Sequence, residues 1–80
     1  MSTAQLEAAI REELRVVEED LARVREWAAE LRRRIGERAD YPTDPAELSA
    51  LIEEAEEQEF LADELEASRE ELLRRLGSSP

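Results

Sequence analysis

Apolar residues in the first half of the chain recur in alternating steps of four and three. They are Ile10, Leu14, Val17, Leu21, Val24, Ala28, Leu31 and Ile35. The same spacing resumes in the second half, at Leu48, Leu51, Ala55, Ala62, Leu65, Leu72 and Leu76. Such spacing is typical of coiled-coil helices, whose apolar stripe forms a seam with a partner helix. Gln58 and Arg69 are polar residues at two seam positions, where they cost stability and can set the register.

The stretch ERADYPTDPAEL, residues 37–48, interrupts this pattern. Pro42 disfavours helical geometry at the residue before it. Asp44 is a good N-cap for a new helix, Pro45 suits its first position, and Glu47 at its third position can reach back to the cap. One unbroken helix is therefore not expected, and the chain should reverse direction in this stretch.

The sequence predicts a single all-α domain, an antiparallel two-helix coiled-coil hairpin. We expect the first helix over about residues 3–38, with a capping box formed by Ser2 and Gln5. We expect a turn over about residues 39–43, the second helix over about residues 44–76, and a short tail over residues 77–80.

The charged residues are unevenly distributed. The net charge is −11; residues 1–40 carry ten acids and eight Arg, whereas residues 41–80 carry twelve acids and three Arg. Direct binding to nucleic acid or to an anionic membrane is not expected, because it needs a basic stripe. An antiparallel hairpin instead sets the Arg-rich end of the first helix beside the acidic start of the second. The expected pairs join Arg32, Arg33, Arg34 and Arg38 to Glu47, Glu53, Glu54 and Glu57.

An enzyme is not expected, because the chain has no His and no Cys, and no nucleophile with a neighbouring base. We predict no catalytic residue, no cofactor and no metal site. The glutamates of residues 53–59 resemble the carboxylate half of a di-metal bundle site, but its His ligands are missing. The sequence also has no apolar run that would span a bilayer and no signal-peptide layout, so a cytoplasmic protein is expected.

Apolar residues beside the seam widen the stripe beyond what one partner helix covers. They are Val16, Trp27, Ile52, Phe60, Leu61 and Leu73. A two-helix seam alone gives a poor balance against the entropy of ordering the chain. We therefore expect a second surface, either in a homodimer that forms a four-helix bundle or in a groove on another protein. The candidate partner contacts are Trp27, Phe60, Leu61 and Leu73.

The second half, DPAELSALIEEAEEQEFLADELEASREELL, resembles the N-terminal coiled-coil hairpin of the Gre transcript-cleavage factors. Asp44 and Glu47 stand at the acidic positions of that family's tip, and Gln58 and Phe60 fall at its Gln-x-Phe offset. In the first helix, residues 19–21 (Glu-Asp-Leu) match a Glu-Glu-Leu step. The chain departs from the family where Leu48 replaces Asn and Leu51 replaces Tyr. The sequence holds no counterpart of the globular C-terminal domain.

The resemblance implies a hairpin that enters the secondary channel of RNA polymerase. Asp44 and Glu47, with Asp40 nearby, would approach the Mg²⁺ of the polymerase active site, so a Mg²⁺ contact is expected only inside that complex. Helix capping alone also explains Asp44 and Glu47. We therefore expect a non-enzymatic protein–protein interaction module, either a Gre-like regulator that contacts RNA polymerase or a self-associating scaffolding coiled coil.

Overall fold

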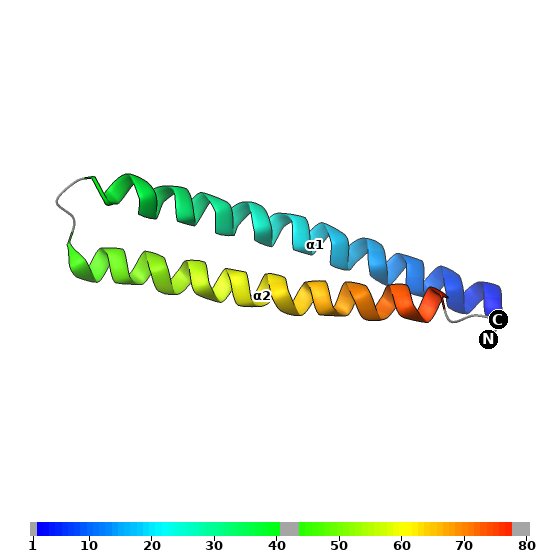
Figure 1. Cartoon of the computed structure of the whole chain (residues 1–80). Coiled ribbons are helices and arrows are strands. Elements are labelled where there is room, and N and C mark those ends of the chain that lie inside the picture. The colour runs from blue at the N-terminus through cyan, green and yellow to red at the C-terminus, as the bar shows by residue number, and fades with distance from the viewer. Residues whose placement is uncertain (1, 41–43, 78–80) are drawn as a thin grey trace.

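The computed structural model describes residues 2–40 and 44–77, and all their regular structure is helical. Helix α1 spans Thr3–Arg38 and helix α2 spans Pro45–Gly77. Figure 1 shows the two helices side by side and antiparallel, with both chain ends at one end of the rod and the connection at the other. The Cα atoms extend over 61 × 15 × 14 Å. The predicted all-α helical hairpin is confirmed, while residues 41–43 of the predicted turn and residues 78–80 of the tail lie outside the described residues.

Side-chain caps begin both helices. The Ser2 hydroxyl accepts a hydrogen bond from the Gln5 backbone N–H at 3.1 Å, and the Ser2 backbone N–H donates to Gln5 Oε1 at 3.0 Å. This is the predicted capping box. At the start of α2, Asp44 Oδ1 accepts a hydrogen bond from the Ala46 backbone N–H at 3.0 Å. The Glu47 carboxylate, predicted to reach back to this cap, instead forms an ion pair with Arg38 across the hairpin.

The core is a single seam between the helices. Every buried residue of the described chain occupies a predicted seam position: Ile10, Leu21, Ala28 and Leu31 in α1, and Ala55, Ala62 and Leu72 in α2. The other seam residues are half-buried, including the polar Gln58 and Arg69. Among residues 2–40 and 44–77, Leu31 is the only large side chain that is fully buried. The heptad pattern therefore predicts which side chains face the partner helix, but the core that they form is thin.

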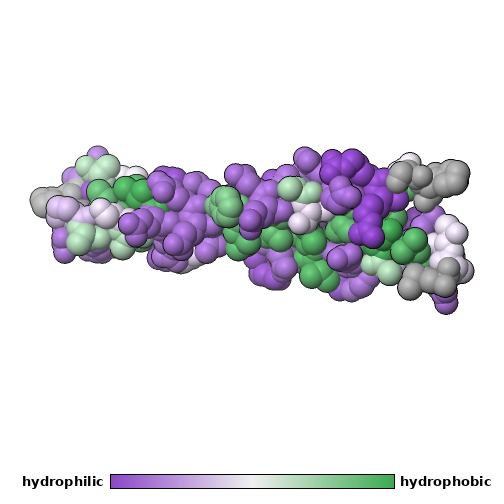
Figure 2. Space-filling view, turned by 90° about the horizontal axis from the view of Figure 1, so that it is seen from below, coloured by the Kyte–Doolittle hydropathy of each residue, from purple (hydrophilic) through white to green (hydrophobic). Residues whose placement is uncertain are grey.

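The rod exposes more surface than a compact protein of its size. Its solvent-accessible surface is 5817 Å², whereas a compact monomer of this length exposes about 4900 Å². Figure 2 shows that hydrophobic patches interrupt a mainly hydrophilic surface on the face drawn, and that the larger patches lie in the half nearer the chain ends. The exposed large apolar residues of the described chain are Leu6, Val16, Trp27, Phe60, Leu61 and Leu73. The excess of about 900 Å² follows from the slender shape of the rod.

Neither described helix combines the length and the apolar character that crossing a membrane requires.

Candidate docking surface

One side of the seam is closed by ion pairs that join the two helices. Arg32 of α1 forms a bidentate pair with Glu59 of α2, with N–O distances of 2.9 and 2.6 Å. Further along, Arg25 of α1 donates to Glu66 of α2 at 2.8 Å. We call this side the ladder flank. Charged side chains bridge the seam along this side.

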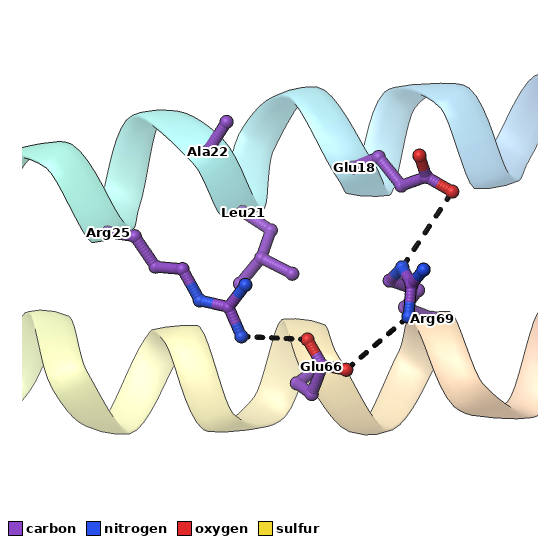
Figure 3. Close-up of a pocket in the computed structure, with 6 residues that line it drawn as sticks. All are labelled: Glu18, Leu21, Ala22, Arg25, Glu66 and Arg69. Atoms are coloured by element: carbon purple, nitrogen blue, oxygen red, sulfur yellow. Dashed lines mark hydrogen bonds and ion pairs between the residues drawn. The ribbon is translucent and has the colours of Figure 1, made fainter.

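Arg69 extends this ladder toward the chain ends. Its guanidinium lies 3.5 Å from the Glu66 carboxylate on its own helix and 3.8 Å from Glu18 on α1. Figure 3 shows Arg69 between these two acids, with Glu66 also reaching Arg25. The polar residue at this seam position therefore directs its charge to the edge of the seam, where it links the helices.

The pair between Arg32 and Glu59 should depend on pH. The Arg32 guanidinium hydrogen-bonds the Glu59 carboxylate and lowers its pKa below the usual value of 4.5. A carboxyl group with a lowered folded-state pKa stabilises the fold above its unfolded-state pKa, and this contribution is lost as the pH falls through the folded-state pKa. We expect Glu59→Gln to lower the melting temperature at pH 7 and to leave it unchanged near pH 2–3.

Thermal unfolding followed by circular dichroism from pH 7 to pH 2 measures this difference. Asp63→Asn is the matched control, because Asp63 is an exposed acid of α2 that forms no ion pair with any described residue. If Glu59→Gln lowered the melting temperature by the same amount at pH 2 as at pH 7, the ion pair would not be the cause.

Only some of the four clustered arginines form ion pairs with α2. Arg38 pairs with Glu47 as predicted, but Arg32 pairs with Glu59 rather than with the predicted acids. Arg33 pairs within α1, with Glu30 at 2.6 Å and with Glu37. Arg34 also pairs with Glu30, at 3.2 Å. Acids three and four residues away on the same helix are close neighbours, so they compete with the acids of α2 for these guanidiniums.

The opposite side of the seam carries the tryptophan. Trp27 Nε1 donates to Glu54 of α2 at 3.3 Å, and the Arg34 guanidinium lies over the ring, 5.2 Å from its centroid. The indole still remains 37% exposed. It forms part of the wall of a shallow depression of about 460 Å³, together with Arg23, Glu26 and Glu30. The ring is thus held in place by polar contacts at its edge and on its face, while apolar surface stays open to solvent.

Three further exposed apolar residues follow the same side. Glu54 accepts the hydrogen bond from Trp27, and Leu61 lies one heptad after Glu54 on the same helix. Leu61 is 38% exposed. On α1, Leu6 lies three heptads before Trp27, and Val16 lies 11 residues, or about three turns, before it. We call the surface formed by Leu6, Val16, Trp27 and Leu61 the Trp27 flank. The helical phase of Leu6 is the signal that could have added it to the predicted contacts.

The other two predicted contacts lie elsewhere. Phe60 is 64% exposed and lies in a depression with Glu53, Glu56 and Glu57, on the side of α2 that faces away from α1. Leu73 lies one heptad after Glu66 and therefore belongs to the ladder flank. By their helical phase, Trp27 and Leu61 thus lie on the same side of the seam, whereas Phe60 and Leu73 lie on other sides of the rod.

The three predicted acids gather at the hairpin end. Asp44 caps α2, and Glu47 is paired with Arg38. Asp40 is exposed, two residues beyond the end of α1. Within residues 2–40 and 44–77, no three carboxylates come together in a way that would hold a metal ion. Two of the acids therefore have structural roles, as a helix cap and as an ion-pair partner.

No protein-family model, curated protein or solved structure matches this chain.

Proposed function

We propose that the chain is a non-enzymatic protein–protein interaction module whose docking surface is the Trp27 flank. The observation that carries this proposal is the difference between the two sides of the seam. Ion pairs between the helices cover the ladder flank, whereas Trp27 and Leu61 remain exposed on the other side. Tryptophan is enriched among the residues that dominate binding energy at protein interfaces.

Exposed apolar side chains that share one side of a protein mark a surface that a partner can cover. On the Trp27 flank, Trp27 and Leu61 are 37% and 38% exposed. Two occupants fit this surface. A second copy would complete a four-helix bundle and make the chain a scaffolding coiled coil. A different protein with a complementary groove would make it an adaptor or regulator.

The single tryptophan of the chain reports on this surface directly. Docking on the Trp27 flank should shift Trp27 emission to the blue and reduce its quenching by acrylamide, because the partner removes water from the indole. The measurement is made on each complex that sedimentation detects. A complex that forms while Trp27 stays fully quenchable would contradict the proposed docking surface.

A Gre-like regulator of RNA polymerase is the second candidate. It is supported by the slender rod of 61 × 15 × 14 Å, which carries acids at the end opposite the chain ends. In this proposal the tip enters the secondary channel of the polymerase, and Asp40 and Glu47 approach the active-site Mg²⁺. Glu47 would have to leave Arg38 to do so. The chain would act as a competitor for the channel, since Leu48 and Leu51 replace the family's Asn and Tyr.

Binding to purified bacterial RNA polymerase tests this second candidate. Asp40→Asn and Glu47→Gln are expected to weaken binding, because both remove charge at the tip and leave Asp44 as the helix cap. Asp63→Asn is the control, an exposed acid of α2 away from the tip. Failure of the parent chain to bind the polymerase would exclude the Gre-like role without affecting the proposed docking surface.

A further inference from the structure

We propose that the occupant of the Trp27 flank is a second copy of the chain, related by a two-fold axis that runs along the rod. This arrangement places both hairpin tips at the same end and packs each α1 against α2 of the other copy. Trp27 of each copy then meets Leu61 of the other. The inference rests on the proposed use of the Trp27 flank and adds the partner, its orientation and the central contact.

Bonds within the hairpin establish which residues of the two helices lie at the same height. Arg32 is joined to Glu59 and Arg25 is joined to Glu66. Lower residue numbers on α1 therefore lie beside higher residue numbers on α2. By this register Trp27 and Leu61 differ in height by about three residues, or roughly 4–5 Å. A two-fold axis along the rod preserves height. It therefore brings two Trp27 and two Leu61 side chains, all partly exposed, into one cluster at the middle of the interface.

Charge complementarity favours this orientation. Residues one heptad apart on the Trp27 flank are Glu13, Asp20, Trp27 and Arg34 on α1, and Glu54, Leu61, Ser68 and Arg75 on α2. At equal heights across the two-fold axis, Arg34 faces Glu54, Asp20 faces Ser68, and Glu13 faces Arg75. No two like charges oppose each other in this row. The result is an apolar centre with a charged rim, as in stable protein interfaces.

The other symmetric arrangement is disfavoured by the charge of α2. A two-fold axis perpendicular to the rod would place α1 on α1 and α2 on α2. Between Pro45 and Ser68 the chain has no basic residue, and the Trp27 flank of α2 carries Glu54 with Glu57 and Glu64 beside it. A perpendicular axis inverts height, so Glu57 of one copy would lie opposite Glu64 of the other, and like charges repel each other. Packing α1 on α2 avoids this contact.

Distances between spin labels measure the orientation. The chain has no Cys, so Ala46→Cys in the first turn of α2 provides a single labelling position near the tip. Ala46 lies 15 residues before Leu61, about 22 Å along the helix. Tips at the same end predict a distance below about 30 Å, and tips at opposite ends predict about 45 Å or more. A measured distance in the longer range would overturn the proposed axis.

Leu61→Glu tests the central contact. We expect it to weaken dimerisation by about tenfold or more in sedimentation equilibrium, because it places two carboxylates where the apolar cluster forms. Leu73→Glu is the matched control: Leu73 is 40% exposed, on the same helix, but on the ladder flank. Both side chains are exposed, so helix content should be retained, and circular dichroism checks this. Equal effects of the two substitutions would overturn the assignment of the interface.

A charge swap between chains tests the pairing of α1 with α2. Arg34→Glu and Glu54→Arg should each weaken the homodimer, since each opposes like charges twice. Mixed together, the two variants should form a heterodimer that is tighter than either homodimer. A mixture that associates no better than its components would overturn the pairing. A parent chain that stays monomeric at all concentrations, with quenchable Trp27, would overturn the second copy as occupant but leave the docking surface open to another protein.

Discussion

Leu31→Ala is expected to lower the free energy of unfolding by about 2–5 kcal/mol, the largest effect of any single substitution that we predict. Leu31 is the only large side chain of the described residues with no exposure. Its replacement removes apolar contact on all sides and leaves a cavity in a seam that has few other buried residues. Alanine is a better helix former than leucine, which offsets only a few tenths of a kcal/mol.

Urea unfolding followed by circular dichroism at 222 nm measures the change. The protein concentration is held constant, because association shifts the apparent stability. For a domain of this size each kcal/mol lowers the melting temperature by roughly 4–8 °C, so thermal unfolding gives a second reading. Leu73→Ala is the control, since Leu73 is 40% exposed. A Leu31→Ala effect no larger than that of Leu73→Ala would mean that the seam is not the core.

Ala55→Leu is expected to destabilise the hairpin by about 1–3 kcal/mol, although it adds apolar volume to a thin core. Ala55 is fully buried, so a larger side chain has no space without moving the helices apart. Hydrophobicity alone predicts that this substitution stabilises the hairpin. Ala50→Leu is the control, because Ala50 is exposed on the same helix. Urea unfolding measures whether the free energy of unfolding falls or rises. A stabilised Ala55→Leu variant would contradict close packing at this position.

Leu31 and Ala55 also lie at the same height of the rod. Trp27 bonds Glu54 and Arg32 bonds Glu59, so this interval of α1 faces this interval of α2. A large residue therefore packs opposite a small one. We expect the double variant, Leu31→Ala with Ala55→Leu, to be more stable than the sum of the two single changes predicts, because it restores the total volume. Strict additivity would show that the two positions do not share a packing layer.

Much of the architecture follows from local features of the sequence. The steps of three and four residues predict the seam, and the seven residues that are buried in the described part of the chain all occupy predicted seam positions. Ser2 and Gln5 form the predicted capping box. These predictions succeed because helix phase and caps depend on residues within about one turn, which the sequence shows directly.

The proposed docking surface is only partly predictable from the sequence. Trp27 and Leu61 were expected to contact a partner, but so were Phe60 and Leu73, which lie on other sides of the rod. Whether an exposed apolar residue joins a patch depends on what the opposite helix places beside it. The ladder flank is closed because Arg25 and Arg32 meet Glu66 and Glu59, a pairing set by the register between helices.

The sequence by itself determined two long helices, the reversal between them and the residues of the seam. The tertiary structure alone decided which side of that seam is closed by charge and which is left apolar, and which Arg is kept within α1 rather than shared with α2. The physical reason is the range of the interactions. Apolar periodicity acts through the phase of one helix, whereas an ion pair between helices depends on atomic positions that exist only after the two helices have packed.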